Sequence, residues 1–377
     1  MNVLILCSDF TIALSTASCL EQEGHSVIGI GTEASRGIAI FSCCERFYEV
    51  SEQLFSSSNH LVKIIHKISQ THGCEFVLPI DVKSILFVSR NQSELKNFIK
   101  LAHVSNESLI DQLDNKWSFY KLLVKLKLPS PSTLLIDNRN NSIPENFMFP
   151  ALTKPLQQTG GTGIRYHASC QNLSKEMGTL ELPVILQEYI SGRDIDCSVY
   201  AKEGEIKAWT IQEHVYGGLE FCHNDEVLSI CSNILSPISY SGVAHFDLRI
   251  DEKTQEVSVL ECNPRFWATV NHSMEAGVNF PELLIKNTGK ENVCGIVTIK
   301  DEICLIPTKK KILLKSAFFS RNKRTHFKPF IDSYLVYLKR NLAAEIYRII
   351  YLKNKALASK WLNFCLKNRY SEKIRII

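Results

Sequence analysis

Short apolar runs alternate with longer segments of helical spacing through the first hundred residues. The expected strands are residues 3–7, 25–31 and 76–80, and the expected helices are residues 11–23 and 61–71. Gly24 and Gly73 lie just past the ends of the two helices, where glycine commonly stops a helix. Two strands joined through a helix favour a right-handed parallel crossover. We therefore predict a doubly wound parallel sheet, an α/β lobe, over residues 1–105.

From about residue 106 the pattern changes to one helical run followed by short alternating strands. The helical run is residues 113–126, and the strands are residues 149–154, 164–167, 183–190, 196–200, 205–210, 242–250 and 257–262. Polar turns at Glu203-Gly204 and at residues 251–255 separate strands that would pair antiparallel. We predict a second unit over residues 106–300, with a smaller lobe at about residues 130–190, so that the chain is α+β overall.

The turn after the first strand argues against a dinucleotide site. It reads Cys7-Ser8-Asp9-Phe10 and lacks the Gly-x-Gly-x-x-Gly pattern that lets a backbone approach a pyrophosphate. We therefore do not expect NAD or FAD to bind this lobe.

A glycine-rich loop follows the strand that carries Lys154. Gly160, Gly161 and Gly163 would let backbone N–H groups close over phosphates, and the lysine would add a positive charge. A hairpin tip rich in glycine is the common structural alternative. This segment alone does not decide between the two.

Oxygen-bearing side chains occur within the last two apolar strands. Glu261 and Asn263 are two residues apart and so share one face of a strand. If the turn at residues 251–255 closes a hairpin, Asp247 lies across from them. Their apolar flanks place these carboxylates toward the interior, where they need a cation or another partner. Three oxygen ligands on one face suit Mg²⁺.

Two arginines and one further strand complete the set of candidates. Arg249 and Arg265 flank the acidic face, where each would bind a phosphate or carboxylate, or form a salt bridge with a neighbouring acid. The strand at residues 184–190 would offer backbone groups to an adenine edge, and Asp194 beyond it would hold ribose hydroxyls. A core strand ending in a turn is the structural alternative for this segment.

Together these motifs resemble the ATP-grasp superfamily. The segments that carry the resemblance are Phe149–Pro155 with its glycine loop, Gln187–Asp194, Asp247–Arg249 and Val259–Arg265. The last is similar to the Glu-x-Asn-Pro-Arg signature of the carbamoyl-phosphate-synthase-like branch, which includes carboxylate–amine ligases. The resemblance covers roughly residues 1–290. It implies a two-lobed ATP-grasp fold that follows the parallel-sheet lobe.

The resemblance also implies a role for each candidate residue. Lys116 and Lys154 would contact the phosphates of ATP, Lys154 would also reach the adenine, and the glycine loop would form a flexible lid. The other implied contacts are Gln187, Glu188 and Ile190 for adenine, Asp194 for ribose, and Asp247, Glu261 and Asn263 for Mg²⁺, with Mn²⁺ as an alternative metal. Arg265 would steady the transferred phosphoryl group, and Arg249 is the second expected catalytic residue.

These parts predict an ATP-dependent ligase that activates a carboxylate as an acyl phosphate for attack by an amine. Phosphoryl transfer needs mainly positioning and charge neutralisation, so no protein nucleophile is expected. Carboxyphosphate chemistry of the carboxylase type and an ATP-binding scaffold without turnover stay open as alternatives. The residues expected at the pocket edge, or equally in an ordinary polar strand and loop, are His214, Tyr216, Glu220 and His223.

The net charge of +4 over 377 residues hides a basic C-terminal end. Residues 301–377 contain 18 Lys or Arg and 5 Asp or Glu, so they carry about +13 and the first 300 residues about −9. Apolar residues at helical spacing over residues 334–357 predict a basic helical appendage. Peripheral contact with an anionic membrane or a polyanion is the next alternative, and no nucleic-acid motif accompanies the charge.

Thirteen cysteines form no Cys-x-x-Cys pair, which argues against a zinc site. The N-terminus lacks the basic segment of a signal peptide, and no apolar stretch approaches the ~20 residues of a membrane span. We expect reduced cysteines in a cytoplasmic protein, with the inner membrane face as an option for the tail. A homodimer is an expectation of the family resemblance alone.

Overall fold

The computed structural model describes residues 1–56, 58–158, 160–215, 218–288, 296–299 and 303–307, and beyond these Leu357, Lys360, Leu362 and residues 374–376. Most of the basic helix predicted at residues 334–357 lies outside the described residues.

A six-stranded parallel sheet combines the first hundred residues with the last described strand. The strand order is β16-β3-β2-β1-β4-β5, and every neighbouring pair is parallel. The strands are β1 (Asn2–Cys7), β2 (Ser26–Gly31), β3 (Arg46–Glu49), β4 (Cys74–Pro79), β5 (Lys100–Leu101) and β16 (Ile374–Ile376). The predicted parallel sheet is therefore confirmed.

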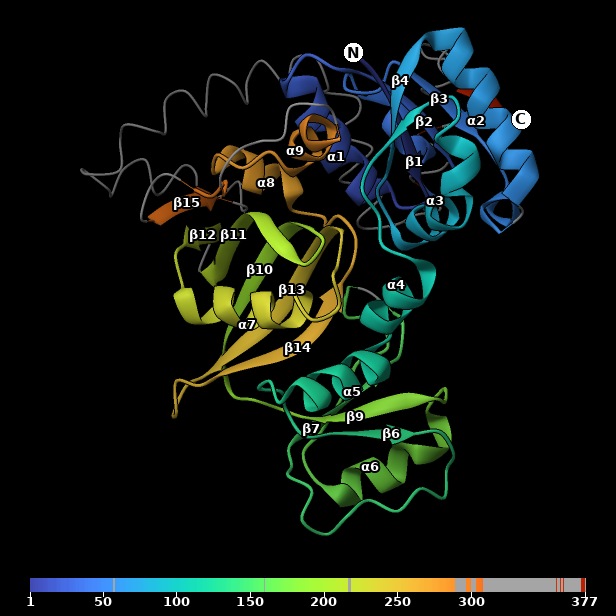
Figure 1. The fold of residues 1–377 in the computed structure, drawn as a ribbon. Coiled ribbons are helices and arrows are strands. Elements are labelled where there is room, and N and C mark those ends of the chain that lie inside the picture. The colour runs from blue at the N-terminus through green and yellow to red at the C-terminus, as the bar shows by residue number, and fades with distance from the viewer. Residues whose placement is uncertain are drawn as a thin grey trace.

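Helices cover both faces of this sheet (Figure 1). The helices are α1 (Phe10–Gln22), α2 (Ser58–His72) and α3 (Val82–Leu95), with short 3₁₀ turns η1 (Arg36–Ile40) and η2 (Glu52–Phe55). Val3 and Ile5 of β1 share a core cluster with α1, whereas Leu4 and Leu6 pack with α2 and α3. Because both faces of β1 are buried, the strand is a continuous apolar run.

A second sheet of six antiparallel strands forms the centre of the molecule (Figure 1). Its order is β14-β13-β10-β11-β12-β15. The strands are β10 (Gly192–Lys202), β11 (Glu205–Val215), β12 (Gly218–Cys222), β13 (Gly242–Asp251), β14 (Val257–Asn263) and β15 (Ile303–Pro307). One face packs against α4 (Glu107–Asp114), α5 (Lys116–Leu126) and α7 (Asp225–Leu235). The other face joins α8 (Val270–Glu275), α9 (Phe280–Asn287) and α1 in one core cluster.

A smaller antiparallel sheet lies on the far side of α5 from the central sheet (Figure 1). Its strand order is β6-β9-β7-β8. The elements are β6 (Thr133–Ile136), β7 (Ala151–Pro155), β8 (Arg165–His167), α6 (Cys170–Glu176), η3 (Met177–Thr179) and β9 (Val184–Glu188). The mixed α/β architecture agrees with the fold class expected from the sequence. The domain boundaries near residues 105 and 300 stay predictions.

The single helical run predicted at residues 113–126 was wrong, because two helices meet there. Asn115 between them has non-helical backbone angles, φ −81° and ψ 113°. Its side-chain oxygen accepts hydrogen bonds from the N–H groups of Trp117 and Ser118, both at 3.1 Å. Asparagine favours this capping position over a helix interior, so α5 starts afresh at Lys116.

The C-terminal end returns to the first sheet, which the sequence analysis did not predict. Strand β16 pairs with β3 in parallel and becomes the edge of the sheet. Leu362 is only 1% exposed and belongs to the core cluster that contains α1. These residues therefore pack as part of the fold rather than as an appendage.

Candidate functional site

Strands β13 and β14 form the hairpin expected from the sequence, and this hairpin brings the oxygen-bearing candidates together. Asp247 lies directly across from Glu261, and His245 lies across from Asn263. The pairing register shifts between Asp247 and Leu248, which is a local bulge beside the acidic pair. Three candidate ligands from two strands therefore meet on one face of the central sheet.

The two facing carboxylates compete for one proton. Burial raises the pKa of Asp247 well above its usual range, and the neighbouring Glu261 raises it further. Burial also opposes ionisation of Glu261, but the hydrogen bond with Asp247 and the charge of Lys116 outweigh it and lower its pKa to about 2. Two acids this close together therefore favour a neutralising partner between them, either a proton or a cation. Such a donor set fits a divalent cation, which would take the place of the proton.

Lys116 connects this carboxylate pair to the glycine-rich segment. Its Nζ lies 2.9 Å from Glu261 Oε2 and donates a hydrogen bond of 2.9 Å to the carbonyl oxygen of Gln158. The side chain is about 9% exposed. Because Lys116 is the first residue of α5, the cap at Asn115 fixes the backbone from which this side chain extends.

Lys154 on β7 is a second buried cation near the same carboxylates. Its Nζ donates to Gln187 Oε1 at 2.7 Å, and Gln187 in turn donates to Thr133 Oγ1 at 3.2 Å. Burial lowers the pKa of Lys154, while the charge of Glu261 partly restores it. A buried ammonium group whose hydrogen-bond partner is a neutral amide can still bind an anion.

The three glycines of the glycine-rich segment have left-handed backbone conformations. Gly160, Gly161 and Gly163 have φ values of 65°, 74° and 76°. A Cβ at Gly163 would lie 2.7 Å from Cγ of Pro155, whereas a Cβ at Gly160 or Gly161 would meet nothing within 4 Å. Glycine is therefore required at position 163 both by backbone strain and by space.

The two candidate arginines make different contacts. Arg265 is buried, and it donates to the side-chain oxygen of Asn263 and to the carbonyl oxygen of Phe266, both at 2.8 Å. Arg249 instead lies 2.6 Å from the carboxylate of Asp194 and donates to Tyr189 Oη at 3.2 Å. Arg265 thus sits beside the metal-ligand candidates, and Arg249 sits beside the ribose candidate.

The segment expected to hold adenine has two backbone N–H groups already engaged. The N–H of Glu188 donates to the carbonyl oxygen of Ser132 at 2.9 Å, and that of Tyr189 donates to the carbonyl oxygen of Pro150 at 3.0 Å. Of the two backbone groups of Glu188, only the carbonyl oxygen is therefore left to accept a hydrogen bond from adenine. Ile190 follows directly and is half-buried.

Known structures share this arrangement of sheets. One is the L-amino acid ligase from Bacillus licheniformis, with a TM-score of 0.59 and 15% identity, covering 76% of this chain and 73% of that chain. Another is the biotin carboxylase domain dimer of the Hydrogenobacter thermophilus 2-oxoglutarate carboxylase in complex with MgADP, ADP and bicarbonate. Its TM-score is 0.54 at 15% identity, and the match covers 78% of this chain and 71% of that one. Residues 181–308 match the family described as ATP-grasp in the biosynthetic pathway with Ter operon.

This chain has the ATP-grasp fold. The expectation drawn from the sequence motifs is confirmed at this level.

Two curated relatives are longer than this chain. It is 24% identical over 244 residues to the arginine-specific carbamoyl phosphate synthase large chain of Geobacillus stearothermophilus, covering 59% of this chain and 23% of that protein. It is 22% identical over 228 residues to D-aspartate ligase of Enterococcus faecium, covering 49% of this chain and 52% of that protein. The chain thus spans between a quarter and a half of these relatives.

The ATP-grasp face carries further polar residues that the sequence analysis did not select. Asp196 on β10 and His245 on β13 lie next to Asp247, with one ligand atom from each of the three within 4.8 Å of the others. Both alternate with apolar residues along their strands, as Asp247 does. The sequence signal that could have identified them was a polar residue two positions from a candidate ligand, or across from one in the sheet.

Of the four residues expected at the pocket edge, the three that the structure describes divide between the two faces of the central sheet. His214 lies 2.7 Å from Asp196 on the site face. Glu220 pairs with Glu213 on the neighbouring strand, and His223 packs edge-on against Trp209, 5.1 Å between ring centroids. Tyr216 lies outside the described residues.

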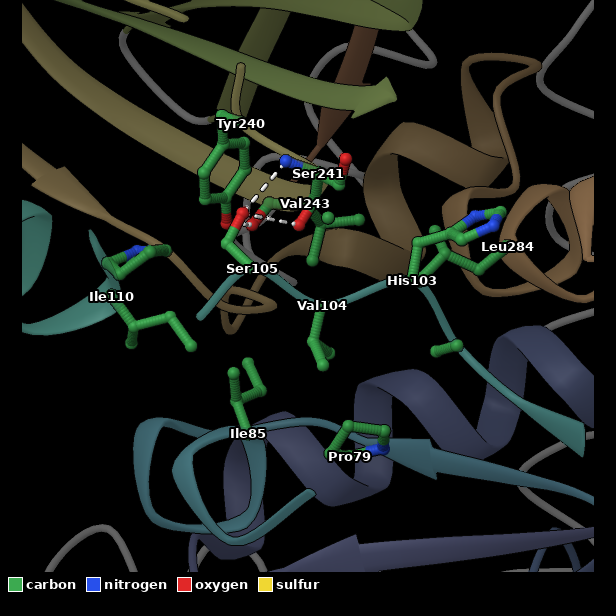
Figure 2. Close-up of a pocket in the computed structure, with 13 residues that line it drawn as sticks. Pro79, Ile85, His103, Val104, Ser105, Ile110, Tyr240, Ser241, Val243 and Leu284 are labelled. Carbon is green, nitrogen blue, oxygen red and sulfur yellow. Dashed lines mark hydrogen bonds between the residues drawn. The ribbon is translucent and has the colours of Figure 1, made fainter. Parts of the chain in front are cut away.

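A separate pocket between the first sheet and the central sheet does not belong to the ATP-grasp site. Figure 2 shows Pro79 and Ile85 facing Tyr240 and Val243 across this pocket. The Ser105 hydroxyl donates a hydrogen bond of 3.0 Å to the carbonyl oxygen of Ser241. The cavity volume of about 10 Å³ is that of a single water. We therefore regard it as a packing seam.

Across the described residues, we find no helix with the length and apolar character needed to cross a membrane.

Proposed function

We propose that this ATP-grasp chain is a Mg²⁺-dependent ligase that uses ATP to activate a carboxylate as an acyl phosphate, which an amine then attacks. The observation that carries the proposal is the meeting of two buried lysines with a carboxylate pair. Lys116 lies 2.9 Å from Glu261, which faces Asp247 across the hairpin, and the charges of Glu261 and Asp247 both act on Lys154. Two cations and two acids at one point fit a metal–triphosphate group.

Asp247, Glu261 and Asn263 would hold Mg²⁺, with Mn²⁺ as an alternative. When bound, the metal would neutralise charge on the phosphates. Lys116 and Lys154 would bind and orient the phosphate oxygens, and Gln187 would keep Lys154 in place. Arg265 would steady the transferred phosphoryl group, because its contacts with Asn263 fix it beside the metal ligands.

At the other end of the nucleotide, Asp194 would hold the ribose and Arg249 would position Asp194. Backbone groups of Glu188 and Ile190 would bind the adenine, with Gln187 alongside. The loop with Gly160, Gly161 and Gly163 would close over the phosphates and exclude water, which protects an acyl phosphate from hydrolysis. The proposed ligase reaction is supported by two of the similar proteins, which are an L-amino acid ligase and a D-aspartate ligase.

The acid that is activated would be a small organic carboxylate. Bicarbonate is the second candidate, because the relatives include a carbamoyl phosphate synthase and a biotin carboxylase domain with bound bicarbonate. A scaffold without turnover would not need to keep a carboxylate pair together with a lysine in contact with it and a second buried lysine nearby.

The test measures ADP and phosphate release by the purified protein with Mg²⁺-ATP, pools of carboxylic acids and amines, and bicarbonate in a separate arm. We expect release that depends on one organic acid pool and is lost in Glu261→Ala. Release that depends on bicarbonate alone would favour carboxyphosphate chemistry. Absence of nucleotide binding would refute the proposal.

A cytoplasmic location, a homodimer and contact of the basic tail with an anionic membrane surface are further parts of the proposal. The dimer is supported by the dimeric biotin carboxylase domain among the similar structures. The membrane contact is supported by the charge of about +13 on residues 301–377.

A further inference from the structure

A row of polar side chains continues from the carboxylate pair across the central sheet into β10 and β11. His245 Nε2 lies 3.3 Å from Asp247 Oδ1 and 3.8 Å from Asp196 Oδ2. Asp196 Oδ2 in turn accepts hydrogen bonds from His214 at 2.7 Å and from Gln212 at 3.0 Å. The row begins at the candidate metal site and ends at His214.

Asp196 is a buried carboxylate in the middle of this row. It is 6% exposed and alternates with the fully buried Ile195 and Cys197 along β10. The hydrogen bonds from His214 and Gln212 satisfy an oxygen that burial removes from water. A buried carboxylate that accepts a hydrogen bond from an imidazole fixes the tautomer and the orientation of that ring.

Among the described residues, one ring nitrogen of His214 has a hydrogen-bond partner and the other has none. Its Nε2 faces Asp196, and about half of its side chain is exposed. An Nε2–H that donates to a carboxylate leaves the lone pair on Nδ1, which is the tautomer of a proton acceptor. The hydrogen bond to Asp196 raises the pKa of His214 against the opposing effect of burial, and the charge of Asp194 adds to the rise. The residue across from His214 on β12 is the apolar Leu219.

His245 does not offer the same group. It is stacked on Trp267 with 5.2 Å between ring centroids, and its Nδ1 bonds to the hydroxyl of Ser198 at 2.8 Å. Both of its nitrogens therefore face protein atoms. Of the two imidazoles in the row, His214 alone combines an orienting carboxylate with an exposed side.

We propose that His214, held by Asp196, accepts the proton of the substrate ammonium group that attacks the acyl phosphate, so that β11 forms the amine subsite. This inference rests on the proposed ligase function. An ammonium ion has no lone pair and cannot attack a carbonyl carbon. One N–H proton passes to His214 Nδ1, and the neutral nitrogen forms a bond to the acyl carbon. The bond from that carbon to the phosphate oxygen then breaks, and the phosphate leaves with the electron pair and the second nitrogen proton.

The test compares two nucleophiles in His214→Gln. Glutamine places an amide nitrogen where His214 Nε2 lies, so the contact with Asp196 is kept while the proton acceptor is lost. The matched control is His223→Gln, since His223 is exposed and packs on Trp209 instead. The protein is supplied with Mg²⁺-ATP, a panel of L- and D-amino acids as carboxylates, and either hydroxylamine or glycinamide.

Hydroxylamine is neutral at pH 7 and attacks an acyl phosphate without losing a proton first, whereas much of the glycinamide is protonated. We expect His214→Gln to form hydroxamate within about 2-fold of the unaltered protein. Amide formation with glycinamide should fall about 10²- to 10⁴-fold, the range of general-base catalysis, and recover as pH rises. His223→Gln should match the unaltered protein with both nucleophiles.

Equal losses with both nucleophiles would show that His214 is structural and overturn the inference, as would an unchanged rate with glycinamide. If the unaltered protein forms no hydroxamate with any panel acid, the ligase function itself fails, and the inference fails with it. The hydroxylamine arm therefore separates the two failures.

Discussion

Replacing Lys154 with methionine should separate the free energy of unfolding from the affinity for nucleotide. Lys154 is 6% exposed, and its Nζ is held by the side-chain oxygen of Gln187 at 2.7 Å. Methionine keeps most of the length and apolar surface of the side chain but removes the charge. In the folded protein the substitution removes a desolvated cation and leaves the Gln187 oxygen without that donor.

The two effects on stability nearly cancel. An unsatisfied buried acceptor costs about 1–3 kcal/mol. Removing a buried charge whose pKa is lowered by desolvation offsets part of that cost. We therefore expect the free energy of unfolding to change by no more than about 2 kcal/mol. Nucleotide affinity has no such compensation, because a lysine about 4 Å from a phosphate charge contributes about 4 kcal/mol at an effective dielectric constant of 20. That energy corresponds to roughly 10³-fold in Kd.

The assay is calorimetric titration with MgADP and with a non-hydrolysable ATP analogue, beside urea unfolding of the same samples. Lys121→Met is the matched control, since Lys121 is an exposed lysine of α5 near Trp117. Its Kd should stay within about 2-fold. A Lys154→Met protein that is folded and binds the ATP analogue normally would refute the reasoning.

The same lysine predicts opposite pH dependences for stability and binding. Its pKa is lowered in the folded state, so the unfolded chain binds more protons at alkaline pH. The contribution of Lys154 to stability therefore rises as pH increases through the lowered pKa. Affinity for the ATP analogue should fall over that same interval, because only the protonated lysine attracts phosphate. Lys154→Met should lose this part of both pH dependences.

Three further tests address the lid, the tail and the thiols. Gly163→Ala should slow ATP turnover and destabilise the lid by roughly 1–2 kcal/mol, because φ at this position is 76° and the Pro155 ring would lie 2.7 Å from the new Cβ. Gly178→Ala is the control, since its new Cβ would meet no atom within 4 Å. It should change neither ATP turnover nor the melting temperature. Leu362→Ala should cost about 2–5 kcal/mol in urea unfolding, whereas Leu357→Ala, at a 53% exposed side chain, should cost under about 0.5 kcal/mol. Among the described cysteines Cys170 is the exposed one. Iodoacetamide should therefore alkylate Cys170 far faster than the buried cysteines, which peptide mapping over time would measure. Equal alkylation rates would contradict this packing.

Local sequence patterns were enough to define most strands and the hairpin that carries the acids. The period of two put Glu261 and Asn263 on one face, and the turn at residues 251–255 put Asp247 across from Glu261. These inferences succeed because strand alternation and short turns act over a few residues. The left-handed backbone at Gly160, Gly161 and Gly163 was seen only in the structure.

Contacts between distant segments required the tertiary structure. The sequence could not show that Arg249 would meet Asp194 rather than the acidic pair, nor that Lys116 would reach Glu261 from the start of a new helix. The pairing of β16 with β3 joins residues more than 300 positions apart, and no local signal specifies such a partner.

The sequence by itself therefore determined the class of fold and the residue types available for phosphate and metal. The tertiary structure decided which side chains share a charge, which are held by neutral partners, and that His214 and Asp196 form a pair beside the site. The physical reason is that hydrogen bonds and ion pairs depend on separations of about 3 Å between atoms. Such separations are fixed only when sheets and helices from the whole chain pack together.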